Sequence, residues 1–415
     1  MTVTDQASTT GSAPAPGEGT FDVLRLNPAF RRLWMATVST SLGQWMQSTA
    51  IGWLALELSD KSSFVGLVAF AAGIPFLFVS IPGGLLLDRF DRRKVLIICQ
   101  IIAAVCAVLI SVDVISGLVR TWHLLLFAFV NGSMQAIMNP AQQAIVPSLV
   151  SRARLTNGIA LMSAGQNMTR VVGPSVAGAI IGIAGTGAAF LCQAVALIAA
   201  LMLLVTARFP EMSVQRAVTS LGSVFDGARI VWSRPDLRAI ITLVSISILM
   251  VFPYLSFLSV FARDVLVIGP EGLGILMASS GFGAVVGSIY VATRKQQPSG
   301  KTYILTGIVY GFNIAAFALA PNLLWAVLLL IAAGFLGSAY VSSVNAGIQH
   351  RIADDMRGRV MSIYMLTWGF TPIGAIAIGE LSAHYGMAQT IATAAILGNA
   401  LLAAQYFFSP ATREL

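Results

Sequence analysis

Charge is what this sequence has least of. Only 10% of its 415 residues are Asp, Glu, Lys or Arg, whereas 57% are hydrophobic. Soluble domains carry roughly 25% charged residues, so this composition excludes an ordinary soluble protein. A helix needs about 20 apolar residues to cross a bilayer core of about 30 Å, and the sequence supplies such runs repeatedly. It therefore predicts an all-α integral membrane protein.

Cysteine and histidine are also scarce, with three of each. They are Cys99, Cys106, Cys192, His123, His350 and His384. The cysteines lie in apolar runs and none of the six has metal-site or disulfide spacing. No G-x-x-x-x-G-K-[ST] loop is present, so ATP is not the direct energy source. We expect no metal, no cofactor and no enzymatic activity.

The apolar runs number twelve when they are bounded by charged residues, glycines, prolines or polar turns. Their limits are 30–58, 63–87, 94–116, 121–148, 155–184, 187–207, 237–262, 270–293, 302–320, 323–350, 358–382 and 387–408. We predict twelve membrane-spanning helices.

The basic residues fall on one side of these runs. With the N-terminus inside, 21 of the 25 Lys and Arg residues lie in cytoplasmic segments and three lie in outer loops. Cytoplasmic loops are enriched in Lys and Arg, so we expect both termini to be cytoplasmic. An odd number of spans would scramble this distribution.

The longest internal polar segment divides the spans into equal sets. The predicted organisation is a disordered tail (1–29), a six-helix bundle (30–207), a cytoplasmic linker (208–236), a second six-helix bundle (237–408) and a cytoplasmic tail (409–415). A weak repeat, NPAQQ at 139–143 and NAGIQ at 345–349, supports duplication. Two six-helix halves are typical of secondary transporters.

The link between spans two and three carries a motif. The segment 83–94 reads GGLLLDRFDRRK, which resembles the major facilitator superfamily loop G-x-x-x-D-[RK]-x-G-[RK]-[RK]. Asp91 stands where the general pattern has glycine. Together with the segments NPAQQAIVPSLV and RGRVMS, this loop sequence resembles the bacterial branch of the superfamily that contains the enterobactin exporter. The resemblance covers the whole membrane part of the chain.

The resemblance implies the major facilitator fold, with two bundles related by a pseudo-two-fold axis, in the bacterial inner membrane. It implies proton-coupled export of an amphipathic siderophore-like or drug-like molecule by alternating access. Uptake of a small solute and lipid or lysolipid flipping stay open as alternatives. The expected partners are the bilayer, a small-molecule substrate and protons, with no nucleic acid, and the chain is expected to be a monomer.

The same resemblance implies a conformational latch at the cytoplasmic loop. Its predicted members are Gly84, Asp88, Arg89, Arg92, Arg93, Arg357, Gly358 and Arg359. Physically, Asp88 would accept hydrogen bonds at the N-terminal end of span eleven, an interaction worth about 0.3–1 kcal/mol. The alternative for the outer bases is that they only set orientation.

Polar residues within spans form stripes at helical spacing. The predicted substrate-binding residues are Gln44, Gln47, Asn131, Gln135, Gln166, Arg170, Ser342 and Asn345. By resemblance, spans one, four, seven and ten line a central cavity. For each amide, hydrogen bonding between helices is the alternative.

Arg170 is the single base within a span. A charge at the centre of a membrane helix costs about 2.5–3.5 kcal/mol on insertion scales, so it should have a partner. We expect it to face the cavity and favour anionic or carbonyl groups. The alternative is that it binds neighbouring polar groups such as Gln166.

Two further sets complete the predictions. Glu57, Asp113 and Glu380, near the outer ends of their spans, are candidate proton carriers. Gly173, Pro174 and Gly178 resemble the span-five motif of proton-coupled antiporters, with Thr169 where that motif has glycine. Physically, they would kink the helix and allow close packing, and ordinary packing stays the alternative.

Overall fold

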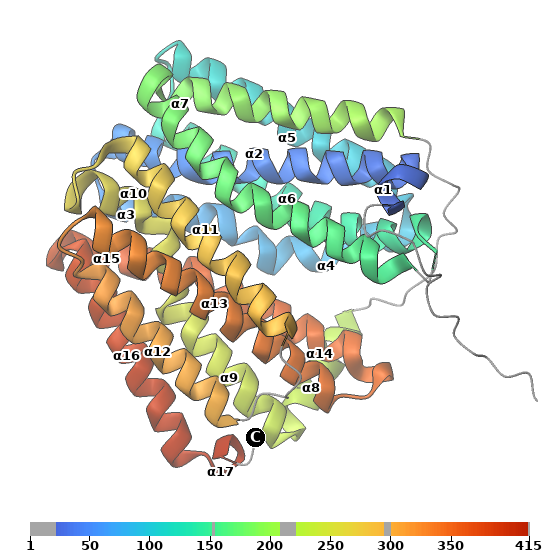
Figure 1. Ribbon diagram of the computed structural model, residues 1–415, viewed down its shortest axis with the longest axis vertical. Helices are drawn as coiled ribbons and strands as arrows, with labels where there is room; N and C mark the ends of the chain where they lie inside the picture. Colours follow the sequence, from blue (N-terminus) through green and yellow to red (C-terminus); the bar gives the residue numbers. More distant parts are fainter. Residues whose placement is uncertain (1–21, 152–153, 208–220, 294–299, 414–415) are drawn as a thin grey trace, which may run out of the picture.

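The computed structural model of the protein describes residues 22–151, 154–207, 221–293 and 300–413, and in these ranges all regular structure is helical (Figure 1). The predicted all-α fold is confirmed. Most of the predicted N-terminal tail, the first part of the linker and the last two residues lie outside the described ranges.

The first bundle is built from α1 to α7. Its helices are α1 (Asp22–Leu26), α2 (Pro28–Ser59), α3 (Ser62–Gly73), α4 (Pro75–Arg89), α5 (Arg92–Ile115), α6 (Thr121–Leu149) and α7 (Leu155–Thr206).

The second bundle follows the linker helix α8 (Leu221–Ser233). Its elements are α9 (Pro235–Met250), η2 (Phe252–Phe257), α10 (Leu258–Val260), η3 (Phe261–Val265), α11 (Gly269–Thr293), α12 (Gly300–Ala318), α13 (Leu323–Arg351), α14 (Asp354–Thr367), α15 (Phe370–Tyr385), α16 (Met387–Phe408) and α17 (Pro410–Arg413).

Every predicted span falls on one helix or on a broken series of helices. Within the described ranges, nine helical segments are long and apolar enough to cross a membrane, and α2 and α12 are not among them. One of the nine is the 52-residue α7, which is interrupted at Gly185 (φ 82°, ψ 171°), between the predicted spans 155–184 and 187–207. The count of twelve stays a prediction.

Three predicted spans are broken helices. The run 63–87 divides at Ile74, because Pro75 has no N–H to continue the helix α3. The run 237–262 changes to a 3-10 helix at Phe252, next to Pro253. The run 358–382 is interrupted at 368–369, between α14 and α15. A hydropathy pattern alone does not detect these breaks.

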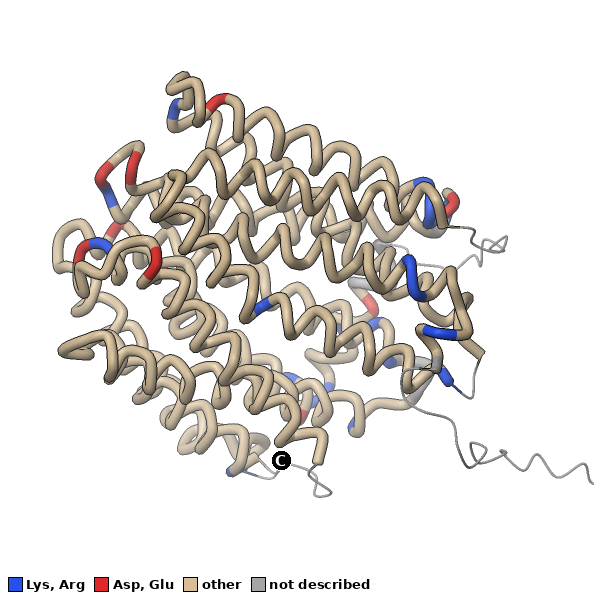
Figure 2. Tube along the Cα trace, turned by 45° about the horizontal axis from the view of Figure 1, so that its top comes forward, with Lys and Arg blue, Asp and Glu red and all other residues tan. Residues whose placement is uncertain are grey.

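Charged residues gather at the two ends of the helices (Figure 2). We call one end the basic end; it carries Arg89, Arg234 and Arg351, at the ends of α4 and α13 and the start of α9. The opposite end carries Asp60 and Arg263. We call it the sealed end, for the contacts described below.

The apolar core joins the two bundles in one half of the molecule only. One cluster runs from Leu54 and Val65 of the first bundle to Val251 and Phe257 of the second. Another cluster, around Phe30 of α2, contains residues of the first bundle alone. The bundles therefore share a core toward the sealed end, where α3 packs against α15 and α10 packs against α2 (Figure 1).

Candidate functional site

Small residues bring the two bundles into contact toward the sealed end. A methyl group added at Gly66 of α3 would lie 2.7 Å from the carbonyl oxygen of Ala375 on α15. One added at Gly178 of α7 would lie 2.6 Å from the carbonyl oxygen of Pro270, at the start of α11. Both distances are too short for a carbon atom, so the bundles approach this closely only because glycine stands there.

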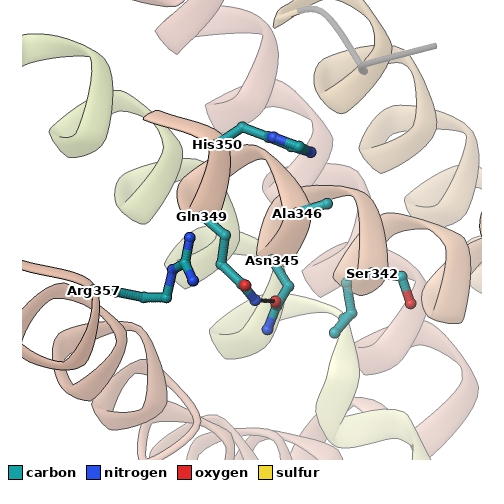
Figure 3. A pocket seen from close by; sticks show the side chains of 7 residues that line it. Ser342, Asn345, Ala346, Gln349, His350 and Arg357 are labelled. Carbon is teal, nitrogen blue, oxygen red and sulfur yellow. Dashed lines mark hydrogen bonds between the residues drawn. The ribbon is translucent and has the colours of Figure 1, made fainter. Parts of the chain in front are cut away.

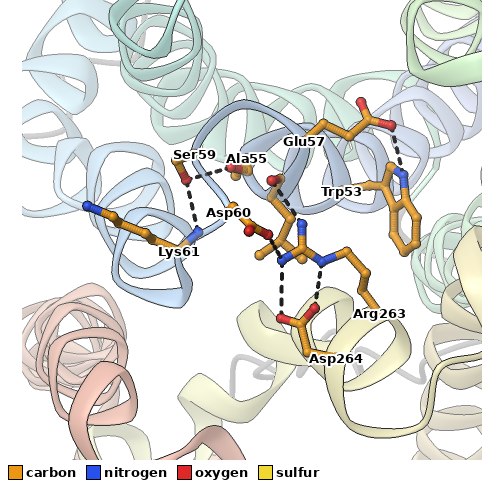
Figure 4. Close-up of polar contacts among 9 residues, drawn as sticks. Trp53, Ala55, Glu57, Ser59, Asp60, Lys61, Arg263 and Asp264 are labelled. Carbon is orange, nitrogen blue, oxygen red and sulfur yellow. Dashed lines mark hydrogen bonds and ion pairs between the residues drawn. The ribbon is translucent and has the colours of Figure 1, made fainter.

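A polar contact closes the same end (Figure 4). Arg263 of the second bundle donates to the Leu56 carbonyl oxygen at 2.9 Å and pairs with the Asp60 carboxylate at 2.6 Å. Asp60 ends α2 in the left-handed conformation, with φ 55°. Arg263 therefore satisfies a carbonyl at the C-terminus of α2, where a cation is favourable. The hydroxyls of Ser62 and Ser382 add a 2.7 Å contact between α3 and α15.

The basic end contains a cavity of about 420 Å³ (Figure 3). Its lining residues are Val341, Ser342, Asn345, Ala346, Gln349, His350 and Arg357. Gln349 donates to the Asn345 side chain at 2.5 Å, and the Arg357 side chain reaches the cavity from α14. Ser342 and Asn345, two predicted substrate-binding residues, thus face a space large enough for a small organic molecule.

The predicted residues of the first bundle lie apart from that cavity. Gln44, Gln47, Asn131 and Gln135 border a space of only about 10 Å³, the size of a single water site. Gln47 is buried and accepts a 2.8 Å hydrogen bond from Gln193. The buried Asn131 amide donates to the backbone of its own helix. In this conformation Gln47 and Asn131 are internal packing residues.

Arg170 lies at a close contact between α7 and α11. A methyl group added at Gly281 of α11 would lie 2.7 Å from the Arg170 carbonyl oxygen and 3.2 Å from its Cγ. The guanidinium carbon is 5.3 Å from the centre of the Trp45 ring, within cation–π range. Gln166, one turn earlier on α7, is exposed, and the described residues contain no hydrogen bond between it and Arg170.

The described hydrogen bonds of two predicted latch residues lie within the first bundle. Arg92 donates to the Ala144 carbonyl at 3.3 Å and Arg93 to the Val205 carbonyl at 2.9 Å, both in the first bundle. A methyl group added at Gly358 would meet no atom within 4 Å. The remaining members, Gly84, Arg89, Arg357 and Arg359, lie at the same end, and the Asp88 side chain is outside the described part. The latch therefore stays a prediction.

The three predicted proton carriers differ in their surroundings. Glu57 accepts from the Trp53 indole at 3.0 Å and from Thr186 of α7 at 2.8 Å (the Trp53 contact is in Figure 4). The Asp113 carboxylate pairs with His123 across the short loop between α5 and α6. Glu380 is exposed, with no hydrogen bond or ion pair to a described residue. Among the described hydrogen bonds of these three carboxylates, the one to α7 is that of Glu57, and it lies beside the interruption at Gly185.

The glycine and proline motif of α7 packs the helix on both sides. An added methyl at Gly173 would lie 2.6 Å from Trp45 Cβ of α2, and Gly178 faces α11. Pro174 lies inside the helix, but the residue with non-helical angles is Gly185. Pro174, where a kink was predicted, is therefore not the position at which α7 breaks. The break lies at Gly185, because glycine readily adopts the positive φ found there.

Sequence reasoning missed several residues of the sealed end. Arg263 is one of the three bases that the sequence places in outer loops, and no sequence pattern singles out Asp60. Arg263 lies in the short helix η3 and Asp60 at the end of α2, and their pairing joins positions far apart in the chain. Trp45 was hidden within an apolar run. A sequence carries no direct signal for such contacts.

Comparison with known proteins relates nearly the whole chain to one protein family. Residues 19–413 match the family described as "Transmembrane secretion effector", which belongs to the major facilitator superfamily. The staphyloferrin A transporter of Staphylococcus aureus is 23% identical over 391 residues, covering 89% of this chain and 93% of that protein. The multidrug efflux pump Tap of Mycobacterium tuberculosis is 28% identical over 408 residues, with 94% of each chain covered.

Solved structures share the fold. A bacterial homologue of the human lysosomal transporter Spinster, in an inward-facing conformation, superimposes with a TM-score of 0.75 at 16% identity, over 95% of this chain and 98% of the other. A D-xylose–proton symporter gives a TM-score of 0.71 at 12% identity, over 96% of this chain and 100% of the other. At these identities the likeness concerns the fold alone.

Proposed function

This chain belongs to the transmembrane secretion effector family of the major facilitator superfamily, and we propose that it exports an amphipathic small organic molecule, siderophore-like or drug-like, by alternating access. Its family and relatives make it a multi-pass membrane transporter and not an enzyme. The observation that carries the proposal is the asymmetry of the molecule. A cavity of about 420 Å³ lies at the basic end, while Arg263 and Asp60 tie the bundles together at the other.

We assign the basic end to the cytoplasm of a bacterial inner membrane. Lys and Arg are enriched in cytoplasmic loops, and that end carries the basic ends of α4, α9 and α13. Both termini are then cytoplasmic, and the cavity admits cargo from the cell interior. This direction agrees with the related multidrug efflux pumps.

The cargo site combines residues from both bundles. Ser342 and Asn345 line the cavity, and Gln44 and Gln135 are partly exposed toward the narrow space in the first bundle. A rocking of the bundles about the midplane would bring the two walls to one molecule. Gln47 and Asn131 would then contribute only if their internal hydrogen bonds exchange for contacts with cargo.

A proton gradient is the proposed energy source. The chain is proposed to work as a monomer. Glu57 is the favoured carrier, since its carboxylate joins α2 to α7. Protonation would weaken that contact, because a neutral carboxyl group accepts hydrogen bonds less strongly than a carboxylate.

Dye accumulation in cells tests the proposal. Cells with and without the chain are loaded with a panel of amphipathic dyes, with the amount of protein in the membrane measured in parallel. We expect lower accumulation when the chain is present and recovery when a protonophore is added. Higher accumulation would indicate uptake instead. Translocation of a fluorescent lysolipid in proteoliposomes, without export of any dye, would favour a flippase.

A further inference from the structure

We propose that Arg170 and Trp45 form an anion-recognition site at the inner edge of the contact between α7 and α11, so that the cargo is an organic anion with a flat apolar body. The inference rests on the proposed function and deepens it by naming the chemical class of the cargo. Three observations carry it: the missing counter-charge, the aromatic cover and the place of the site in the fold.

Arg170 has no acidic partner in the described part of the chain. Within the described ranges no carboxylate pairs with it, and none of its five N–H groups donates to a described residue. The hydroxyls of Tyr254 and Tyr310 interact with it electrostatically, but both groups are neutral and buried. Tyr254 also contacts Ser280, at 3.3 Å. A cation in such a setting is stabilised by an anion that arrives from outside.

Trp45 supplies an apolar wall beside the cation. Its ring centre lies 5.3 Å from the guanidinium carbon, and the side chain is half-buried. Gly173 allows this approach, since a methyl group there would lie 2.6 Å from Trp45 Cβ. A guanidinium presents paired N–H donors that match the two oxygens of a carboxylate. An aryl or similarly flat carboxylate therefore suits both groups.

The position of the site couples it to alternating access. The helices α7 and α11 run in opposite directions, and the close contacts at their glycines run from Arg170 and Gly281 through Gly178 and Gly274 toward the sealed end. An anion bound at Arg170 thus lies at the boundary between the open and the closed part of the molecule. When the contact between α7 and α11 opens, the same group becomes accessible from the opposite side.

Binding of three ligands of one shape tests the inference. The full chain is reconstituted in phosphatidylcholine nanodiscs and titrated with 2-naphthoate, 2-naphthylmethanol and 2-naphthylmethylammonium. We expect naphthoate to bind about tenfold more tightly than the alcohol, as charge-assisted hydrogen bonds predict, and the ammonium ion to bind most weakly. Arg170→Gln should remove this order, and Arg170→Lys should keep it with reduced affinity for naphthoate.

A matched variant controls for the overall charge of the protein. Arg238→Gln removes one positive charge from an exposed position at the start of α9 and should leave all three affinities unchanged. The inference is overturned if the ammonium ion binds as tightly as naphthoate, if naphthoate does not bind at millimolar concentration, or if Arg170→Gln keeps the order. Each outcome is independent of the dye experiment, so a failure here leaves export standing and the reverse also holds.

Discussion

Arg263 and Asp60 form an ion pair of 2.6 Å that joins the two bundles at the sealed end (Figure 4). The pair connects η3 of the second bundle with the end of α2 in the first. In the proposed cycle of alternating access the sealed end opens, and this contact then breaks once in each cycle. Its strength therefore contributes to the balance between the two conformations.

Asp60→Asn should shift this balance toward opening of the sealed end. The Asp60 side chain is 86% exposed, so the pair is screened by water and contributes about 0.2–1 kcal/mol, a shift of roughly 1.4-fold to fivefold. Distances between spin labels on α3 and α15 would measure it. Asp264→Asn is the control, since Asp264 also pairs with Arg263 but belongs to the same bundle. An equal shift in both variants would contradict a role between bundles.

Gly178→Ala should separate the bundles at the sealed end. The added methyl group would lie 2.6 Å from the Pro270 carbonyl oxygen, so α7 and α11 must move apart. We expect greater reactivity of cysteines introduced at the sealed end and slower transport. Gly165→Ala makes an equally close contact, 2.6 Å from Val38, but inside the first bundle. It should lower thermal stability without changing the reactivity of the introduced cysteines. Similar cysteine reactivity in the two variants would contradict a separation of the bundles by the methyl group added at Gly178.

Gln47→Ala should lower the stability of the protein and should not act directly on cargo binding. The change leaves the buried Gln193 amide without its acceptor. An unpaired buried polar group costs about 1–3 kcal/mol, and hydrogen bonds between membrane helices average about 0.6 kcal/mol. We expect a lower melting temperature in detergent. Gln44→Ala borders the same narrow space and has no such bond in the described part of the chain, so it should melt like the parent. A parent-like melting temperature for Gln47→Ala, with transport lost, would restore its role in binding cargo.

The contrast between Gln47 and Ser342 shows what the sequence can and cannot specify. Polar side chains at helical spacing within apolar runs predict residues that avoid lipid, and both residues do so. Which of them faces a cavity depends on a partner such as Gln193, which lies on another helix far along the chain. Likewise, hydropathy located the run 63–87 but not its break at Ile74, since a broken apolar helix is as apolar as a straight one.

Glu57→Gln should uncouple transport from an imposed pH gradient. The amide oxygen can accept from the Trp53 indole while the amide N–H donates to the Thr186 hydroxyl, so the contact with α7 survives while the titratable group is lost. In proteoliposomes we expect no response to the gradient, with exchange of cargo down its own gradient retained. Asp113→Asn and Glu380→Gln should respond like the parent. If either of them loses the response while Glu57→Gln keeps it, the carrier is reassigned.

Asp91→Gly should leave transport intact, whereas Asp88→Asn should abolish it. Asp91 is the N-cap of α5, where its carboxylate accepts from the Arg93 backbone N–H at 2.8 Å. Glycine is also tolerated at an N-cap, and replacing Asp by Gly there costs only a few tenths of a kcal/mol. The departure from the superfamily pattern at Asp91 is thus a change of one acceptable capping residue for another.

Asp88, in the last turn of α4, has the latch as its predicted role, and a latch needs a charged acceptor when the basic end closes. Transport rates and membrane levels of the two variants, measured together, separate these roles. Loss of transport in Asp91→Gly at parental protein levels would make Asp91 part of the latch.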